Sequence, residues 1–167
     1  MTALIAFLAV WSNMSPQIVH AGVKWEADYH QAREIGARLQ KPLAVFVGSG
    51  ADGWKQVVRE GSLSAEARRQ ISERFVPVYV NAATESGQKL AEAFGLVNKR
   101  GLIISDRTGG LMAFHHDGDL ELSDLVKHLN RFGDPDHIVI TTESNDFPVT
   151  ANVVSAGAKV NPFACQT

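Results

Sequence analysis

The chain has 167 residues, of which 45% are hydrophobic and 20% are charged, as is usual for a globular protein. This length suits a single domain with one main hydrophobic core. Its 16 basic and 18 acidic side chains give a net charge of −2, so no strong positive field attracts nucleic acid or an anionic membrane. The composition therefore argues against nucleic acid as a partner.

The N-terminal segment is typical of a signal peptide. An apolar run from Met1 to Trp11 is too short to span a bilayer as a helix. Val19-His20-Ala21 follows, with residues that signal peptidase accepts, which predicts cleavage after Ala21. No Lys or Arg precedes the apolar run, so a true start further upstream, or an amphipathic or buried N-terminal segment, stays open. We expect export to the periplasm or beyond, with no transmembrane span in the mature chain.

Cys165 is the single cysteine of the chain. With only one thiol, the chain can form no intramolecular disulfide and no metal site built from several thiolates. The N-terminal segment also lacks the cysteine that would anchor a lipoprotein. In an oxidising compartment Cys165 could link two chains in a disulfide-bonded dimer or stay a free, reactive thiol.

The first predicted element is a helix ending near Gln40, because apolar residues recur at helical spacing: Trp25, Tyr29, Ala32, Ile35 and Leu39. A continuous apolar strand over 43–47 follows, then helical character over 54–60 and a second helix through Arg74. The later predicted elements are a strand over 76–80, a helix over 86–96, strands over 101–105 and 111–116, and a final helix with Leu122, Leu125, Leu129 and Phe132 facing inward. Beyond Gly133 the pattern weakens to a short β-like run over 137–142.

Gly48, Gly50 and Gly53 follow the first strand with the G-x-G-x-x-G spacing of a dinucleotide-binding turn. The second strand, however, ends in Asn81-Ala82-Ala83, without the acidic residue that holds the ribose. Only five turn residues, 106–110, join the third and fourth strands, which predicts an antiparallel hairpin. We therefore expect no dinucleotide cofactor and assign the glycines to backbone geometry. Backbone N–H groups at the next helix start could still hold a carboxylate or phosphate.

Several short motifs match a known family: Trp25 with Asp28-Tyr29 and Ala32, Lys41-Pro42-Leu43, Phe75-Val76-Pro77-Val78, Phe94-Gly95-Leu96, and Asp106 with Gly109 or Gly110. With the element order βαβαββα after an N-terminal helix, the chain resembles the secreted bacterial thioredoxin-like proteins over residues 22–132. The resemblance implies a three-layer α/β/α sandwich around a mixed sheet of about four strands. It divides the chain into a signal peptide over 1–21, a thioredoxin-like domain over 22–133 and a flexible C-terminal tail over 134–167.

The resemblance also locates a former active site. The family carries Cys-x-x-Cys, usually followed by Lys, after the first strand, and Lys55 fixes the register so that Ala51 and Trp54 occupy the cysteine positions. The former active-site loop is then Gly50, Ala51, Asp52, Gly53, Trp54 and Lys55. The family's cis-proline position falls on Arg100, beside Lys99. Because both marks of redox chemistry are replaced, the fold could be inherited without the reaction.

Two interpretations of these residues stay open. Trp54 either fills core space left by the lost disulfide or lies in the groove opposite Arg100, where Trp and Arg dominate interface energetics. Lys99 and Arg100 are either binding residues or an ordinary exposed basic pair.

The histidines and the loop serine give no further site. His115 and His116 are adjacent on a strand and point to opposite faces, so we expect a polar strand end and no metal site. His128 is expected on the solvated side of the last helix. Ser49 has no base beside it in sequence, so no nucleophilic site is assembled.

The function that the sequence favours is a redox-inactive, secreted thioredoxin-like domain. It would bind a protein or peptide through its former active-site groove, without a cofactor. The alternative is a thiol–disulfide oxidoreductase that forms mixed disulfides through Cys165. A third hypothesis is a structural module of an envelope assembly.

Overall fold

The computed structural model describes residues 22–144, so the expected signal peptide over 1–21, residues 145–167 and Cys165 lie outside the described residues. Within that range the chain forms a five-stranded sheet and four α-helices. The elements are α1 (Tyr29–Leu39), β1 (Leu43–Gly48), the 3-10 helix η1 (Gly53–Val57), α2 (Ala65–Arg74), β2 (Val76–Asn81), α3 (Glu85–Ala93), β3 (Gly101–Ser105), β4 (Met112–Asp117), α4 (Leu122–Phe132) and β5 (Glu143–Ser144).

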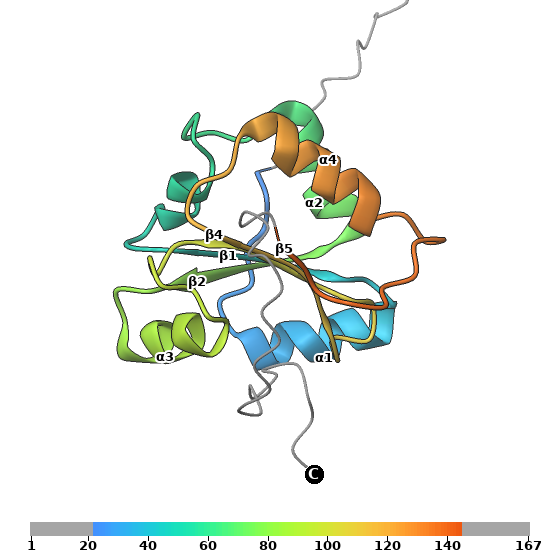
Figure 1. Cartoon of the computed structure of the whole chain (residues 1–167), viewed down its shortest axis with the longest axis horizontal. Coiled ribbons are helices and arrows are strands. Elements are labelled where there is room, and N and C mark those ends of the chain that lie inside the picture. The colour runs from blue at the N-terminus through green and yellow to red at the C-terminus, as the bar shows by residue number, and fades with distance from the viewer. Residues whose placement is uncertain (1–21, 145–167) are drawn as a thin grey trace, which may run out of the picture.

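The strands lie in the order β2-β1-β3-β4-β5. β1 runs parallel to β2 and antiparallel to β3, and β3 pairs antiparallel with β4, as the five-residue turn predicted. Figure 1 shows α1 and α3 on one face of this sheet and α2 and α4 on the other. The predicted three-layer α/β/α sandwich with a mixed sheet is therefore confirmed.

β1 lies at the centre of the packing because all six of its residues are buried. Ala44 and Phe46 belong to the core cluster under α2 and α4, whereas Val45 and Val47 belong to the cluster under α1 and α3. This division follows from the two-residue alternation of side chains along a strand. It explains the continuous apolar run in the sequence, since both faces of β1 are covered.

Three helices begin at a side chain that caps their first N–H groups. The Asp28 carboxylate accepts a hydrogen bond from Gln31 N at 3.0 Å, and the Ser64 hydroxyl accepts one from Ala67 N at 3.0 Å. The Thr84 hydroxyl accepts one from Gly87 N at 3.1 Å. Such caps satisfy N–H groups that have no partner inside the helix, and so they fix where each helix starts.

The sheet has one strand more than the sequence predicted. β5 is only two residues long and pairs in parallel with β4, at Phe114 and His115. It lies beyond residue 133, where the predicted tail begins. The Thr142 hydroxyl donates to the Met112 carbonyl at 2.6 Å, and Arg131 pairs with Glu143 at 2.7 Å. Residues 134–144 thus contact the sheet and α4.

The predicted position of His128 was wrong. The residue is only 8% exposed and its ring stacks on Phe114, with centroids 4.0 Å apart. His128 lies three residues after Leu125 and four before Phe132, which places it on the inward face of α4. Burial lowers the pKa of its imidazole.

Within residues 22–144, the helices are all too short or too polar to cross a lipid bilayer.

Candidate functional site

The loop after β1 and the segment before β3 lie at the same end of the sheet. β1 and β3 are antiparallel, and Val47 near the end of β1 pairs with Gly101 at the start of β3. The loop over 50–55 leaves β1 there, and Arg100 directly precedes Gly101. The loop and Arg100 therefore lie at the same end of the sheet.

Two side chains of β2 hold this loop in place. The Tyr79 hydroxyl donates to the carbonyl of Gly48 at 3.2 Å and also contacts the carbonyl of Gly50. The Asn81 side-chain oxygen accepts a hydrogen bond from Gly50 N at 2.9 Å. Partial burial raises the pKa of Tyr79, which keeps its phenol in the protonated, donating form. The loop is thus a fixed part of the domain.

At each of the three loop glycines, the local geometry disfavours a residue with a side chain. A Cβ on Gly48 would collide with the carbonyl group of Gly53, and a Cβ on Gly53 would collide with the Tyr79 hydroxyl. Gly50 has open space around it but a φ of 88°, a conformation that other residues rarely adopt. The loop's own packing therefore accounts for the G-x-G-x-x-G spacing without a nucleotide.

Two N–H groups at the start of η1 are already bonded. Gly53 N donates to Gly50 O at 3.4 Å, and Lys55 N donates to Asp52 O at 3.0 Å. η1 is a 3-10 helix of five residues, so its dipole is small. These contacts do not favour the carboxylate or phosphate that the sequence left open at this position.

Trp54 is half-buried and stacks on Trp25, which comes from the segment before α1. The two ring centroids are 5.7 Å apart and the planes differ by 29°. Trp25 in turn meets the buried ring of Phe46 edge-on at 5.0 Å, and the Lys55 ammonium lies 5.6 Å from the Trp54 ring centroid. Trp54 thus both packs against the core and keeps part of its indole exposed.

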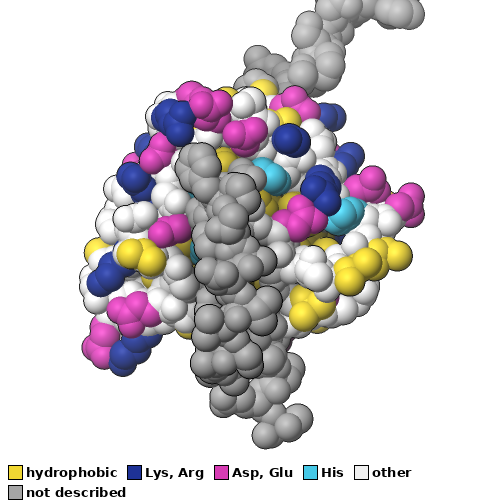
Figure 2. Space-filling model, viewed as in Figure 1, with side chains coloured by type: hydrophobic (Ala, Val, Ile, Leu, Met, Phe, Trp, Pro, Cys, Tyr) yellow, Lys and Arg dark blue, Asp and Glu magenta, His cyan; other side chains and the backbone are white. Residues whose placement is uncertain are grey.

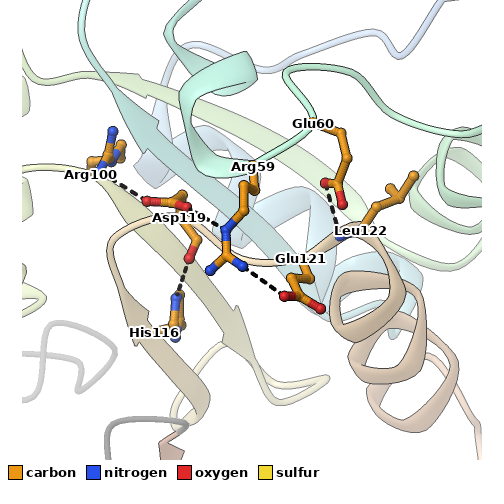
Figure 3. Close-up of polar contacts among 7 residues, drawn as sticks. All are labelled: Arg59, Glu60, Arg100, His116, Asp119, Glu121 and Leu122. Carbon is orange, nitrogen blue, oxygen red and sulfur yellow. Dashed lines mark hydrogen bonds and ion pairs between the residues drawn. The ribbon is translucent and has the colours of Figure 1, made fainter.

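Arg100 is held by Asp119, not by Trp54. One guanidinium nitrogen of Arg100 lies 3.1 Å from the Asp119 carboxylate, and Arg59 Nε lies 3.1 Å from the other oxygen of the same carboxylate. Arg59 also pairs with Glu121 at 2.6 Å. Figure 3 shows Asp119 between the two arginines, which come from the segments after η1 and before β3. Among residues 22–144 there is no cis peptide bond, at Arg100 or elsewhere.

A backbone bridge aligns these charges. Val58 and Leu120 form an isolated parallel β-bridge, in which Leu120 N donates to Val57 O and Arg59 N donates to Leu120 O, both at 2.9 Å. Glu60 accepts a hydrogen bond from Leu122 N at 3.0 Å, at the start of α4. The bridge therefore ties the end of the loop region to the β4–α4 connection.

The Asp119 carboxylate forms ion pairs with both arginines, Arg59 and Arg100. The hydrogen bond from Arg59 lowers the pKa of Asp119, and the charge of Arg100 adds to the effect. The same contact with Asp119 raises the pKa of Arg59. The pairing of Arg59 with Asp119 was not predicted, because nothing in their local sequence pattern signals contact between segments so far apart along the chain.

The segment before Arg100 is also ordered by a carboxylate. Asp117, at the end of β4, accepts hydrogen bonds from Val97 N and Asn98 N, both at 3.2 Å. Lys99 follows with a φ of 51° and an exposed side chain. Gly118 N donates to Arg100 O at 2.8 Å. Lys99 and Arg100 therefore have different surroundings: one is exposed, and the other is engaged in ion pairing.

The two adjacent histidines lie on β4, opposite β3. His115 pairs in register with Ile103 and His116 with Leu102. A ring nitrogen of His116 lies 3.0 Å from the Asp119 carbonyl, so this histidine supports the β4–α4 connection. Within the described range, no three His, Cys, Asp or Glu side chains gather as they would around a metal ion.

A cavity of about 780 Å³ lies at the outer edge of β2. Its lining includes Tyr79 and Asn81, whose side chains anchor the loop, together with the first residues of α1 and α3. Tyr79 and Asn81 therefore belong both to the loop's support and to this hollow.

The loop over 50–55 contains no thiol, and its exposed residue Ala51 carries no nucleophile. Ser49 N and O are bonded to the Gln56 side-chain amide at 3.3 and 3.0 Å. Aromatic and charged side chains surround the loop. Such a surface suits non-covalent contact with another chain.

No family model matches the chain. No curated protein matches its sequence.

One solved structure to which the chain is similar is described as "DsbH Oxidoreductase". The two are 15% identical in sequence and superpose with a TM-score of 0.53, over 75% of this chain and 93% of that chain. At this identity the likeness concerns the fold and does not carry over activity. The chain therefore has a thioredoxin-like fold.

Proposed function

We propose that this chain is an exported thioredoxin-like domain without dithiol chemistry, which binds a protein or peptide at the end of its sheet. The binding surface would consist of the loop over 50–55, Trp25, and the basic residues Lys99 and Arg100. We name it the loop surface. The stacked and partly exposed pair of Trp54 and Trp25 is the observation that carries the proposal.

Several features of the loop surface support a binding role. Trp and Arg are enriched among the residues that contribute most to interface energies. Trp54 is held in one orientation by Trp25 and Lys55, so it would lose little side-chain entropy on binding. Tyr79 and Asn81 fix the loop backbone in the same way. A preorganised aromatic surface of this kind suits an extended peptide or a protein loop.

The residues in the loop argue against thiol–disulfide exchange. That reaction requires a thiolate that attacks a disulfide and, in a dithiol cycle, a second thiol that resolves the mixed disulfide. Neither Ala51 nor Trp54 supplies one, and the single Cys165 could at most form one mixed disulfide. We therefore favour binding over the Cys165 oxidoreductase hypothesis.

Export belongs to the same proposal, and the support for it is the apolar segment followed by Val19-His20-Ala21. N-terminal sequencing of the protein from the cell envelope should find Gly22 as the first residue. An intact Met1 on protein from the cytoplasm would contradict export and would leave the loop-surface proposal standing.

Two assays test the binding and redox parts separately. A peptide array probed with the full chain should show bound sequences that Trp54→Ala loses. Leu39 is 53% exposed and is the last residue of α1, whereas Trp25 lies before the first residue of that helix. The Leu39→Ala variant should therefore still bind these sequences. An insulin-reduction assay with dithiothreitol should show no turnover above the blank. Turnover that Cys165→Ser abolishes would instead support the oxidoreductase.

A further inference from the structure

The segment that precedes β5 has the composition of a β-strand. It reads His137-Ile138-Val139-Ile140-Thr141-Thr142, in which every residue after the histidine is β-branched. It contains no Gly, no Pro and no Asp, Glu, Lys or Arg. Such residues have high β-propensity, and edge strands of monomeric proteins are usually protected by a charge, a proline or a bulge. This segment carries none of those protections.

Exposure alternates over residues 137–140, as it does along a strand with one covered face. Ile138 is 79% exposed and Ile140 is 83% exposed, whereas Val139 between them packs against the core cluster under α4. Leu111, 44% exposed, adjoins Met112, whose carbonyl accepts the Thr142 hydroxyl. Figure 2 shows hydrophobic side chains gathered where this segment runs in Figure 1. Two large isoleucines are therefore exposed in the segment that leads into β5.

The backbone of the segment is also unpaired within the described part of the chain. His137 N donates to Asp134 O at 3.1 Å, but no hydrogen bond joins the backbone of residues 138–141 to any residue of 22–144. The segment leads directly into β5, which pairs with β4 and is the last strand in the order of the described sheet. It therefore offers both backbone hydrogen-bonding groups and apolar side chains at a sheet edge.

We propose that this edge pairs with the same edge of a second copy of the chain. The two copies would lie antiparallel around a two-fold axis at Val139. Ile138 of each copy would then face Ile140 of the other, and His137 would face Thr141. Isologous pairing of this kind requires a surface that is complementary to itself.

The charges around the segment agree with a second copy as the occupant. In this register Asp136 faces Thr142, so no two like charges lie opposite each other, and like charges directly opposite would destabilise the pair. Glu143 is already neutralised by Arg131 at 2.7 Å. The segment carries no charge, so it favours an apolar partner, and a second copy of the chain brings an identical apolar segment.

The proposed pairing leaves the loop surface free. Leu111 and Arg107 belong to the β3–β4 turn, whereas Arg100 lies at the other end of β3. Arg107 donates to the Gly133 carbonyl at 3.3 Å, which places the start of the 133–142 connection at the turn end of the sheet. The self-association proposal therefore does not depend on the proposed peptide binding.

Sedimentation equilibrium of the full chain in the Cys165→Ser background tests the proposal without interference from a disulfide. The wild-type segment should give a monomer–dimer equilibrium. Ile138→Lys with Ile140→Lys would place Lys opposite Lys twice and should weaken dimerisation about tenfold or more. Ile138→Lys with Ile140→Glu has the same number of new charges but pairs Lys with Glu across the axis. It should dimerise at least about tenfold more tightly than the Lys/Lys variant.

Val97→Lys is the matched control, because Val97 is 86% exposed and lies in the segment before Arg100. It should leave the dimer unchanged. Melting curves should show that all variants fold, since the substituted side chains are exposed. A wild-type chain that stays monomeric at every concentration would overturn the proposal, as would a dimer that both double variants weaken equally. Either result would assign the exposed isoleucines to a different partner.

Discussion

Trp54 stacks on Trp25 with their ring centroids 5.7 Å apart, so the loop after β1 and the segment before α1 share one aromatic surface. Trp25 continues this packing into the core through its edge contact with Phe46. The two interpretations that the sequence left open for Trp54 therefore both describe part of its surroundings. It packs against the core, and it is also partly available to a partner.

This intermediate position predicts the stability of Trp54→Ala. A fully buried Trp lost to Ala typically costs about 3–5 kcal/mol. Half-burial and one stacking partner suggest a smaller loss of about 2 kcal/mol in the free energy of unfolding. Urea denaturation measures this value. A loss near zero would place the ring outside the aromatic surface, and failure to fold would make Trp54 a core residue.

The loop glycines give a prediction about backbone geometry. Gly50→Ala introduces no collision but forces a φ of 88° on a residue with a Cβ, which should cost about 1–2 kcal/mol. Gly53→Ala drives a Cβ against the Tyr79 hydroxyl and the Gly48 backbone, so it should destabilise the fold more than Gly50→Ala does. Thermal melting of the two variants compares them. Equal melting temperatures would contradict the close packing of Gly48 and Gly53.

The coupling between Asp119 and Arg59 should depend on pH. The pKa of Asp119 is lowered in the folded state, chiefly by Arg59, so its ion pairs stabilise the fold above the ordinary carboxyl pKa of 3.8. This contribution is lost as the pH falls through the lowered value. A double-mutant cycle of Arg59→Gln and Asp119→Asn should show favourable coupling at neutral pH that disappears in strong acid. The coupling should also weaken in high salt, because the Arg59 side chain is exposed and that of Asp119 is partly exposed. Unchanged coupling in acid would exclude an ionic contact.

His128 should make the fold less stable in mild acid. Burial lowers its pKa, so the unfolded chain takes up a proton near the ordinary value of 6.5 while the folded chain does not. Stability is therefore complete above this value and falls as the pH drops below it. The His128→Phe variant keeps a ring against Phe114 but has no imidazole to protonate. Its free energy of unfolding should therefore fall less than that of the wild type between neutral pH and about pH 5. Parallel slopes for the two proteins would show that other groups cause the acid sensitivity.

Local sequence patterns predicted most of the elements because each depends on its own residues. β3 was predicted over its observed range, 101–105, and the central burial of β1 followed from its continuous apolar run. The inward position of His128 was also readable, since it lies at helical spacing from Leu125 and Phe132. Treating the residue as polar by default caused the error.

The features that sequence could not predict depend on contacts between distant segments. β5 has two residues and exists because β4 lies beside it. Arg59 and Asp119 meet because Val58 and Leu120 form a bridge that no local pattern signals. The partner of Trp54 is likewise set by the fold, which places Trp25 and not Arg100 against its ring.

The most direct test of the account is the affinity of the loop surface for a peptide selected on the array, measured by isothermal titration. Trp54→Ala should weaken binding by about 2 kcal/mol, the usual threshold of an interface hot spot. Leu39→Ala should bind as the wild type does, and Cys165→Ser should too, because the account assigns no role to the thiol. Unchanged affinity of a folded Trp54→Ala variant, or binding that requires Cys165, would contradict the account.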